Sequence, residues 1–148
     1  MNAFLDKYRD HGLLLLRIGL GVMMIVVHGG PKLFGGPEVW AKVGGAMALL
    51  GIDFAPTFWG FCASIAEFGG GLALIVGLAV RPASAALAFT MLVATVMHLG
   101  MGDGLKGSSH SIEIGFVFLG LILVGGGRFS LDARLGAARG AASPALSA

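Results

Sequence analysis

Charged side chains are scarce in this chain, and their scarcity excludes a soluble globular domain. Only 12% of the 148 residues are Asp, Glu, Lys or Arg, whereas 56% are hydrophobic and the mean hydropathy is +0.88. A soluble domain of this length could not bury so much apolar surface. The cations flank hydrophobic segments and form no patch, which argues against a nucleic-acid partner. The composition therefore predicts an integral membrane protein whose first partner is the lipid bilayer.

Cysteine is nearly absent as well. Cys62 is the single thiol, so neither an internal disulfide nor a CxxC redox pair can form within the chain. It lies in an apolar run, where a small buried hydrophobic side chain is the simplest interpretation. Glycine, by contrast, is abundant, with 26 residues that would let membrane helices approach closely. We predict no metal site and no intrinsic cofactor.

Four apolar runs approach the roughly 20 residues that a helix needs to cross a hydrocarbon core. They cover residues 13–33, 56–80, 82–102 and 111–126. The last is short, and its helix is expected to begin inside the preceding loop or to borrow length from it. Residues 37–50 have apolar side chains at helical spacing and predict a short helix lying at the membrane interface. The predicted fold class is all-α: an integral membrane four-helix antiparallel bundle with a short interfacial helix between spans one and two.

The cations predict the orientation of this bundle. Six of them fall on the side of the termini and three on the other, with Arg17 left out as intramembrane and Lys32 interpreted as an interface anchor. This bias predicts that both termini lie in the cytoplasm. Residues 1–12 would then form a cytoplasmic amphipathic segment, residues 13–132 the transmembrane bundle, and residues 133–148 a flexible cytoplasmic tail.

A ligand pocket is predicted around an intramembrane acid. Glu67 lies near the middle of its span with no basic residue within a dozen positions, so we expect an unpaired and neutral carboxyl. His28 and His98 lie roughly two turns from the outer ends of their spans, and the tilt of helical side chains makes both converge on Glu67. These three side chains form the predicted pocket. The alternative is that each makes one structural hydrogen bond and binds no ligand.

The remaining polar residues have predicted roles around this pocket. His110 and Glu113 lie at the beginning of span four, on the outer side. There they would line the pocket mouth and exchange protons with water. Arg17 is interpreted as a structural intramembrane charge that stabilises the cytoplasmic half. Haem ligation by His28 and His98 is a minor alternative, because nothing else in the chain marks a porphyrin site.

Three motifs, in this order, carry a resemblance to a known family: LLRIGLGVMMIVVHGGPKLFGG (residues 15–36), AEFGGGLALIVGLAVRPAS (66–84) and GGGRFSLD (125–132). They resemble the DoxX family of small four-helix bacterial membrane proteins, which implies that this chain is a multi-pass protein of the bacterial cytoplasmic (inner) membrane. The positions that match the family's recurrent pattern are Arg17, His28, Lys32, Glu67, Gly70, Gly71 and Arg128. The family is named after a subunit associated with the thiosulfate:quinone oxidoreductase system. The resemblance therefore implies a bound quinone and a membrane or soluble oxidoreductase subunit as partner, but no settled catalytic set.

Two function classes stay open at this point. In the first, the protein is a quinone-interacting subunit of a membrane-associated oxidoreductase system, in which Glu67 and a histidine hold the two quinone oxygens. In the second, it is a non-catalytic membrane scaffold or a small-molecule permeation module whose polar residues serve packing. The sequence leaves open whether the chain is an enzyme, and a homo-oligomer is compatible with either class.

Overall fold

The computed structural model describes residues 7–142, and within that range the chain is helical and contains no strand. Four helical segments are long and apolar enough to cross a membrane. The first runs continuously through α2 (Arg9–Met23), the π-helical turn η1 (Met24–Gly29) and α3 (Gly30–Phe34). The others are α5 (Pro56–Val76), α6 (Val80–Gly100) and α7 (Gly104–Val124). The predicted all-α membrane bundle is confirmed.

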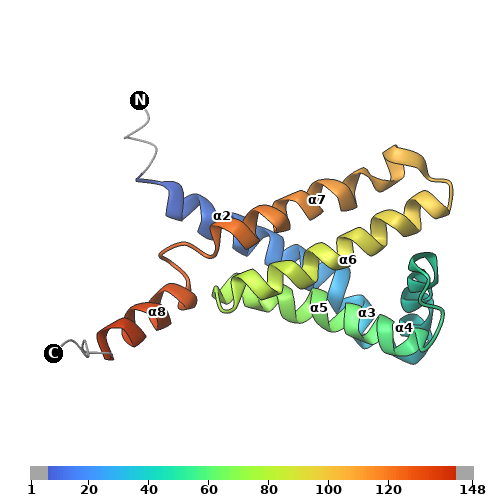
Figure 1. Cartoon of the computed structure of the whole chain (residues 1–148), viewed down its shortest axis with the longest axis horizontal. Coiled ribbons are helices and arrows are strands. Elements are labelled where there is room, and N and C mark those ends of the chain that lie inside the picture. The colour runs from blue at the N-terminus through green and yellow to red at the C-terminus, as the bar shows by residue number, and fades with distance from the viewer. Residues whose placement is uncertain (1–6, 143–148) are drawn as a thin grey trace.

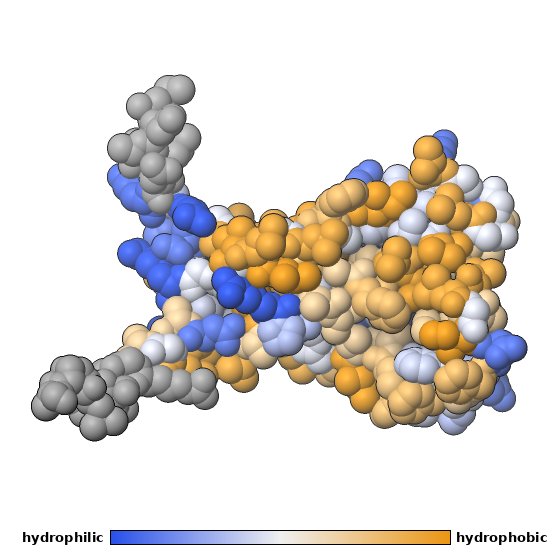
Figure 2. All heavy atoms as spheres, in the orientation of Figure 1, coloured by the Kyte–Doolittle hydropathy of each residue, from blue (hydrophilic) through white to orange (hydrophobic). Residues whose placement is uncertain are grey.

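The dimensions and the surface of the bundle suit a bilayer. A helix of 21 residues, such as α5, α6 or α7, is about 31 Å long at 1.5 Å per residue, which matches a hydrocarbon core of about 30 Å. Hydrophilic residues gather at the two ends of the bundle, and the surface between them is largely apolar (Figure 2). Helices α6 and α7 pack side by side along their length, whereas α5 is contacted by α2, η1, α4 and α6 (Figure 1). The buried core consists of Met24, Leu74, Val80, Leu87, Met91, Phe118 and Leu121.

Hydrogen bonds to the C-terminal motif hold the turn between α5 and α6 in place. The turn lies at residues 77–79, and Pro82 sits in the first turn of α6, where proline is well tolerated. Asp132 accepts hydrogen bonds from the backbone N–H groups of Ala79 (2.7 Å) and Val80 (2.9 Å). One carboxylate therefore caps α6 and ties the end of the GGGRFSLD motif to it.

The short helix predicted over residues 37–50 is present in two parts, α4 (Gly36–Gly44) and the 3₁₀-helix η2 (Gly45–Leu50). It packs against the beginning of α5 by direct backbone contact. A Cβ atom on Gly60 would lie 1.8 Å from the carbonyl oxygen of Trp40, so only glycine permits this approach. The segment therefore forms a fixed cover over one end of α5.

Helix α7 begins at Gly104, seven residues before the predicted start of span four near residue 111, and so extends into the preceding loop. The serines there bond back to the helix, since the Ser108 hydroxyl donates to the carbonyl of Gly104 at 2.9 Å. His110 and Glu113 consequently lie inside α7 and not at its opening. Glu113 is nine residues from the helix start, which places it about 13 Å along the axis.

The C-terminal segment differs from its predicted structure. Where a flexible tail is expected from residue 133 on, helix α8 (Leu131–Ala142) continues to residue 142. Its alanines favour a helix, and Asp132 in its first turn complements the positive end of the helix dipole. Residues 143–148 of the predicted tail and residues 1–6 of the predicted amphipathic segment lie outside the described residues.

Candidate functional site

Glu67 is paired with a lysine. The ammonium of Lys32 donates a hydrogen bond to Glu67 Oε1 at 2.6 Å. The Glu67 side chain is only 4% exposed and that of Lys32 is 30% exposed, so the acid is buried and the base reaches it from a partly open position. The prediction of an unpaired Glu67 is therefore wrong. Its partner is 35 residues away in the sequence, well beyond the local window in which no cation was found.

A close helix contact brings the two side chains together. Gly29, the last residue of the π-helical turn, packs directly on the backbone of α5: a Cβ atom there would lie 2.4 Å from the nitrogen of Phe68 and 2.8 Å from the carbonyl carbon of Glu67. Lys32 comes one turn later, and its own carbonyl accepts a hydrogen bond from Trp40 Nε1 at 2.9 Å. The site is therefore built by backbone packing, and π-helical turns often mark such sites.

A cavity of about 320 Å³ lies beside this ion pair, between α5, α6 and the α4–η2 segment. Helix α5 contributes Trp59, Cys62 and Glu67 from one face, and Lys32 and Thr90 are the other polar lining residues. The remaining wall consists of Val43, Gly44, Ala46, Met47, Ala63, Ala66, Ala86, Phe89, Val93, Ala94 and Met97. The volume of the cavity and its mostly apolar lining with a few polar groups are typical of small-molecule sites.

Two polar atoms of the cavity-lining residues are buried without a hydrogen-bond partner in the described part of the chain. They are Oε2 of Glu67, which can accept, and Nε1 of Trp59, which can donate. Leaving such a group unpaired costs about 1–3 kcal/mol, so a ligand that pairs with either one gains that stabilisation. The two residues are eight positions apart on α5, a rise of about 12 Å, so they would contact different parts of a ligand.

His28 and His110 lie next to each other beside the ion pair, and neither of them lines the cavity. His28 is half-buried and close enough to interact electrostatically with Glu67, Lys32 and His110. Its ring stacks on that of His110, with centroids 5.8 Å apart and planes 18° apart, and His110 is exposed. Glu113 is exposed one turn further along α7 and has no hydrogen-bond or ion-pair partner among residues 7–142.

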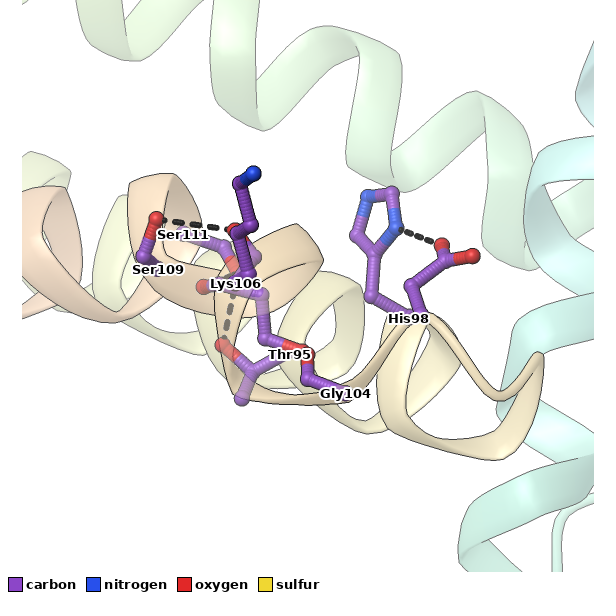
Figure 3. Close-up of polar contacts among 8 residues, drawn as sticks. Thr95, His98, Gly104, Lys106, Ser109 and Ser111 are labelled. Carbon is purple, nitrogen blue, oxygen red and sulfur yellow. Dashed lines mark hydrogen bonds and ion pairs between the residues drawn. The ribbon is translucent and has the colours of Figure 1, made fainter.

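His98 does not join this cluster. Its Nδ1 lies 2.7 Å from Oδ2 of Asp103 in the connection between α6 and α7, and both side chains are partly exposed. Figure 3 shows the His98 ring turned toward this carboxylate, near the contact between Thr95 and Ser111. Of the predicted pocket residues, only Glu67 therefore lines the cavity. His98 instead stabilises the end of its own helix.

Arg17 lies apart from the cavity, in the half of the bundle that holds the termini. It is fully buried; its Nη1 donates to the carbonyl of Leu74 at 2.8 Å and its Nη2 to that of Phe129 at 3.2 Å. These bonds link α2 to the end of α5 and to the C-terminal motif. The structural role of Arg17 stays a prediction.

Residues 7–142 contain no group of three or more His, Cys, Asp or Glu side chains that could hold a metal ion. The polar site consists of Lys32, Glu67 and Trp59, with His28 and His110 beside it. Sequence reasoning missed Lys32, which it assigned to the membrane interface, and did not place Trp59 in the pocket. The signal for Lys32 was available, because a buried intramembrane acid usually pairs with a cation or a backbone group.

Comparison with known proteins gives one match. A family model for DoxX matches residues 12–100, which is more than half of the 148-residue chain. The matched region runs from α2 to the end of α6 and contains the Lys32–Glu67 pair and every residue of the cavity wall. No curated protein and no solved structure matches the chain.

Proposed function

The chain belongs to the DoxX family, and we propose that it is a membrane subunit that binds a lipophilic quinone in the cavity beside Lys32 and Glu67. One observation carries the proposal: an ion pair with an unsatisfied carboxylate oxygen stands on the wall of an otherwise apolar cavity. A quinone ring is apolar on both faces and polar only at its oxygens, so it requires this combination.

The two charged groups have complementary roles toward such a ring. The ammonium of Lys32 donates a hydrogen bond to a quinone carbonyl, and Oε2 of Glu67 accepts one from the hydroxyl of the reduced form. Proton transfer to and from the ring oxygens is general acid–base chemistry, which a carboxylate and an ammonium within hydrogen-bond reach can perform. Lys32 takes the role that the sequence assigned to a histidine, and His98 has no part in the site.

His28 and His110 supply protons to this site. The support is their position: the half-buried His28 lies in electrostatic reach of Glu67 and stacks on the exposed His110. A neutral imidazole accepts a hydrogen bond at one ring nitrogen and donates one from the other, so two adjacent histidines can pass a proton between them. Glu113, one turn from His110 on α7, extends the same line of ionisable groups.

The setting of this site is inferred from the cation bias and the family. With six cations on the side of the termini and three on the other, both termini lie in the cytoplasm of a bacterial cell. The ionisable groups of His28, His110 and Glu113 then lie on the side of the membrane that faces away from the cytoplasm. We propose that electrons reach the quinone from a separate oxidoreductase subunit, the partner that membership of the DoxX family suggests. The competing function is a scaffold or permeation module in which the ion pair only holds η1 and α5 together.

Quinone binding tests the proposal directly. Lipid extracts of the detergent-purified protein are analysed for quinones by mass spectrometry, and decylubiquinone is titrated into the delipidated protein. Glu67→Gln and Lys32→Met should each raise the Kd by about tenfold, equivalent to one lost hydrogen bond of about 1.4 kcal/mol. Lys42→Met, on the exposed side of α4, is the matched control and should bind like wild type. If wild type takes up no quinone, or if Glu67→Gln binds as tightly, the ion pair only joins helices.

A further inference from the structure

Lys32 differs chemically from the other lysines of the bundle because its amine borders an apolar cavity. It lines the cavity of about 320 Å³ and is 30% exposed, whereas Lys42 and Lys106 are exposed at the surface. A primary amine beside an apolar cavity is the arrangement used by proteins that form Schiff bases with carbonyl compounds. The apolar walls would bring an apolar reactant to it and keep water away.

An acid–base group stands beside this amine. Glu67 Oε1 is 2.6 Å from Lys32 Nζ, and Oε2 of the same carboxylate has no hydrogen-bond partner among residues 7–142. Imine formation needs a base to take a proton from the ammonium and then an acid to release water from the intermediate. One carboxylate with one bound and one free oxygen can do both.

We propose that Lys32 captures lipophilic aldehydes as imines in this cavity, whether or not a quinone also binds there. Glu67 takes one proton from the ammonium, and the neutral Nζ attacks the aldehyde carbon, forming a C–N bond as the C=O π pair moves to oxygen. One proton then passes from the nitrogen to the oxygen, which makes a hydroxyl and frees the nitrogen lone pair. The proton that Glu67 took first is returned to this hydroxyl, which leaves as water while the nitrogen lone pair forms C=N. One aldehyde and one ammonium thus give one protonated imine and one water, with no change of oxidation state.

The product fits the site as well as the free lysine does. The protonated imine keeps the positive charge opposite Glu67, so the buried carboxylate is never left unpaired. The alkyl chain lies against the alanine and valine side chains of α5, α6 and η2, where burial favours it by about 0.8 kcal/mol per CH₂. These two features select an aldehyde on an alkyl chain over a small polar aldehyde.

Reductive trapping tests this inference. The purified protein in nanodiscs is incubated with decanal and sodium cyanoborohydride, and the modified lysines are identified by peptide mass spectrometry. Lys32 should react about tenfold faster than Lys42 or Lys106, because the cavity holds the aldehyde against its amine. Glu67→Gln should slow the reaction at Lys32 by about 100-fold, the usual worth of a positioned acid–base group. Lys32→Arg, which keeps the charge pair, should lose the adduct, and Lys42→Arg should leave it unchanged.

Two outcomes would overturn the inference: equal labelling of the three lysines in wild type, or an unchanged rate at Lys32 in Glu67→Gln. The wild-type comparison needs no variant to fold. Propanal serves as the short-chain comparison and should label Lys32 with a smaller preference over the surface lysines than decanal does, because it gains less from the apolar wall. Quinone content is measured on the same samples, so an adduct at Lys32 without quinone refutes the proposed function alone. Quinone binding without preferential labelling refutes this inference alone.

Discussion

Gly29→Ala is the most direct perturbation of the contact that builds the site. Gly29 ends the π-helical turn and packs against the backbone of α5 beside Glu67. The substitution adds one methyl group and no charge. We expect it to move η1 away from α5, and with it the backbone that leads to Lys32.

The size of the effect can be worked out from the distances. The added Cβ would lie 2.4 Å from the nitrogen of Phe68, where ordinary contact is about 3.5 Å, so η1 must retreat by about 1 Å. A shift of that size would lengthen the 2.6 Å contact between Lys32 and Glu67 to about 3.6 Å, beyond hydrogen-bond range. Overpacking costs about 1–3 kcal/mol and a lost charged hydrogen bond about 1.5–3 kcal/mol. Because Lys32 is partly exposed and regains water, we expect a total loss of about 3 kcal/mol.

The assay is unfolding of the protein in mixed micelles by increasing SDS, monitored by far-UV circular dichroism. Gly19→Ala is the matched control: it lies in the same membrane span, and an added Cβ meets nothing within 4 Å. It should be neutral or stabilising by up to about 1 kcal/mol, since alanine favours helix over glycine. Equal free energies of unfolding for Gly29→Ala and Gly19→Ala would refute the close contact and the site built on it.

Three further substitutions test other parts of the structure by the same unfolding assay. Asp132→Ala removes the cap of α6 and should lower the free energy of unfolding by about 1–2 kcal/mol; a wild-type value would show that the cap is not formed. Arg17→Met removes two hydrogen bonds, a buried one to the carbonyl of Leu74 and a part-buried one to that of Phe129, and should lower the free energy of unfolding by about 2–4 kcal/mol. Decylubiquinone affinity should be unchanged, and weaker binding would link Arg17 to the site. Lys32→Met leaves the buried carboxylate of Glu67 without its partner and should lower the free energy of unfolding by up to about 3 kcal/mol. Adding Glu67→Leu to the same chain should restore the free energy of unfolding. Strict additivity of the two changes would contradict the ion pair.

The fold was predictable because each of its elements leaves a local pattern. Apolar runs of about 20 residues predict the spans, and the spacing in residues 37–50 predicts the short helix that the structure shows as α4 and η2. The start of α7 was harder to place, because glycines and serines at residues 104–110 look like a loop. The serines adopt the helix by bonding back to its carbonyls, which no hydropathy pattern reveals.

The site was less predictable because it depends on contacts between distant segments. Regular helical spacing puts His28 on the face of Arg17, but the π-helical turn at residues 24–29 adds a residue to the turn and rotates the helix beyond it. The pairing of Lys32 with Glu67 depends on that rotation and on the glycine contact at residue 29. His98 was misplaced for a different reason: its partner, Asp103, is local and lies just beyond the helix end.

The glycine contacts also indicate how a ligand reaches the cavity. Helix α5 is joined to η1 at Gly29 and to α4 at Gly60 by contacts between backbone atoms, which cannot separate without moving whole helices. Between α5 and α6, the close contact at Gly70 involves a side chain and not a backbone: a Cβ on Gly70 would meet only the side chain of Leu87, at 3.0 Å. Side chains change rotamer far more readily than packed backbones separate. Phe89 of α6 lines the cavity and is also 50% exposed on the outer surface of the bundle. We therefore expect that a ligand dissolved in the bilayer would enter between α5 and α6, past Phe89, and would reach the ion pair without crossing water.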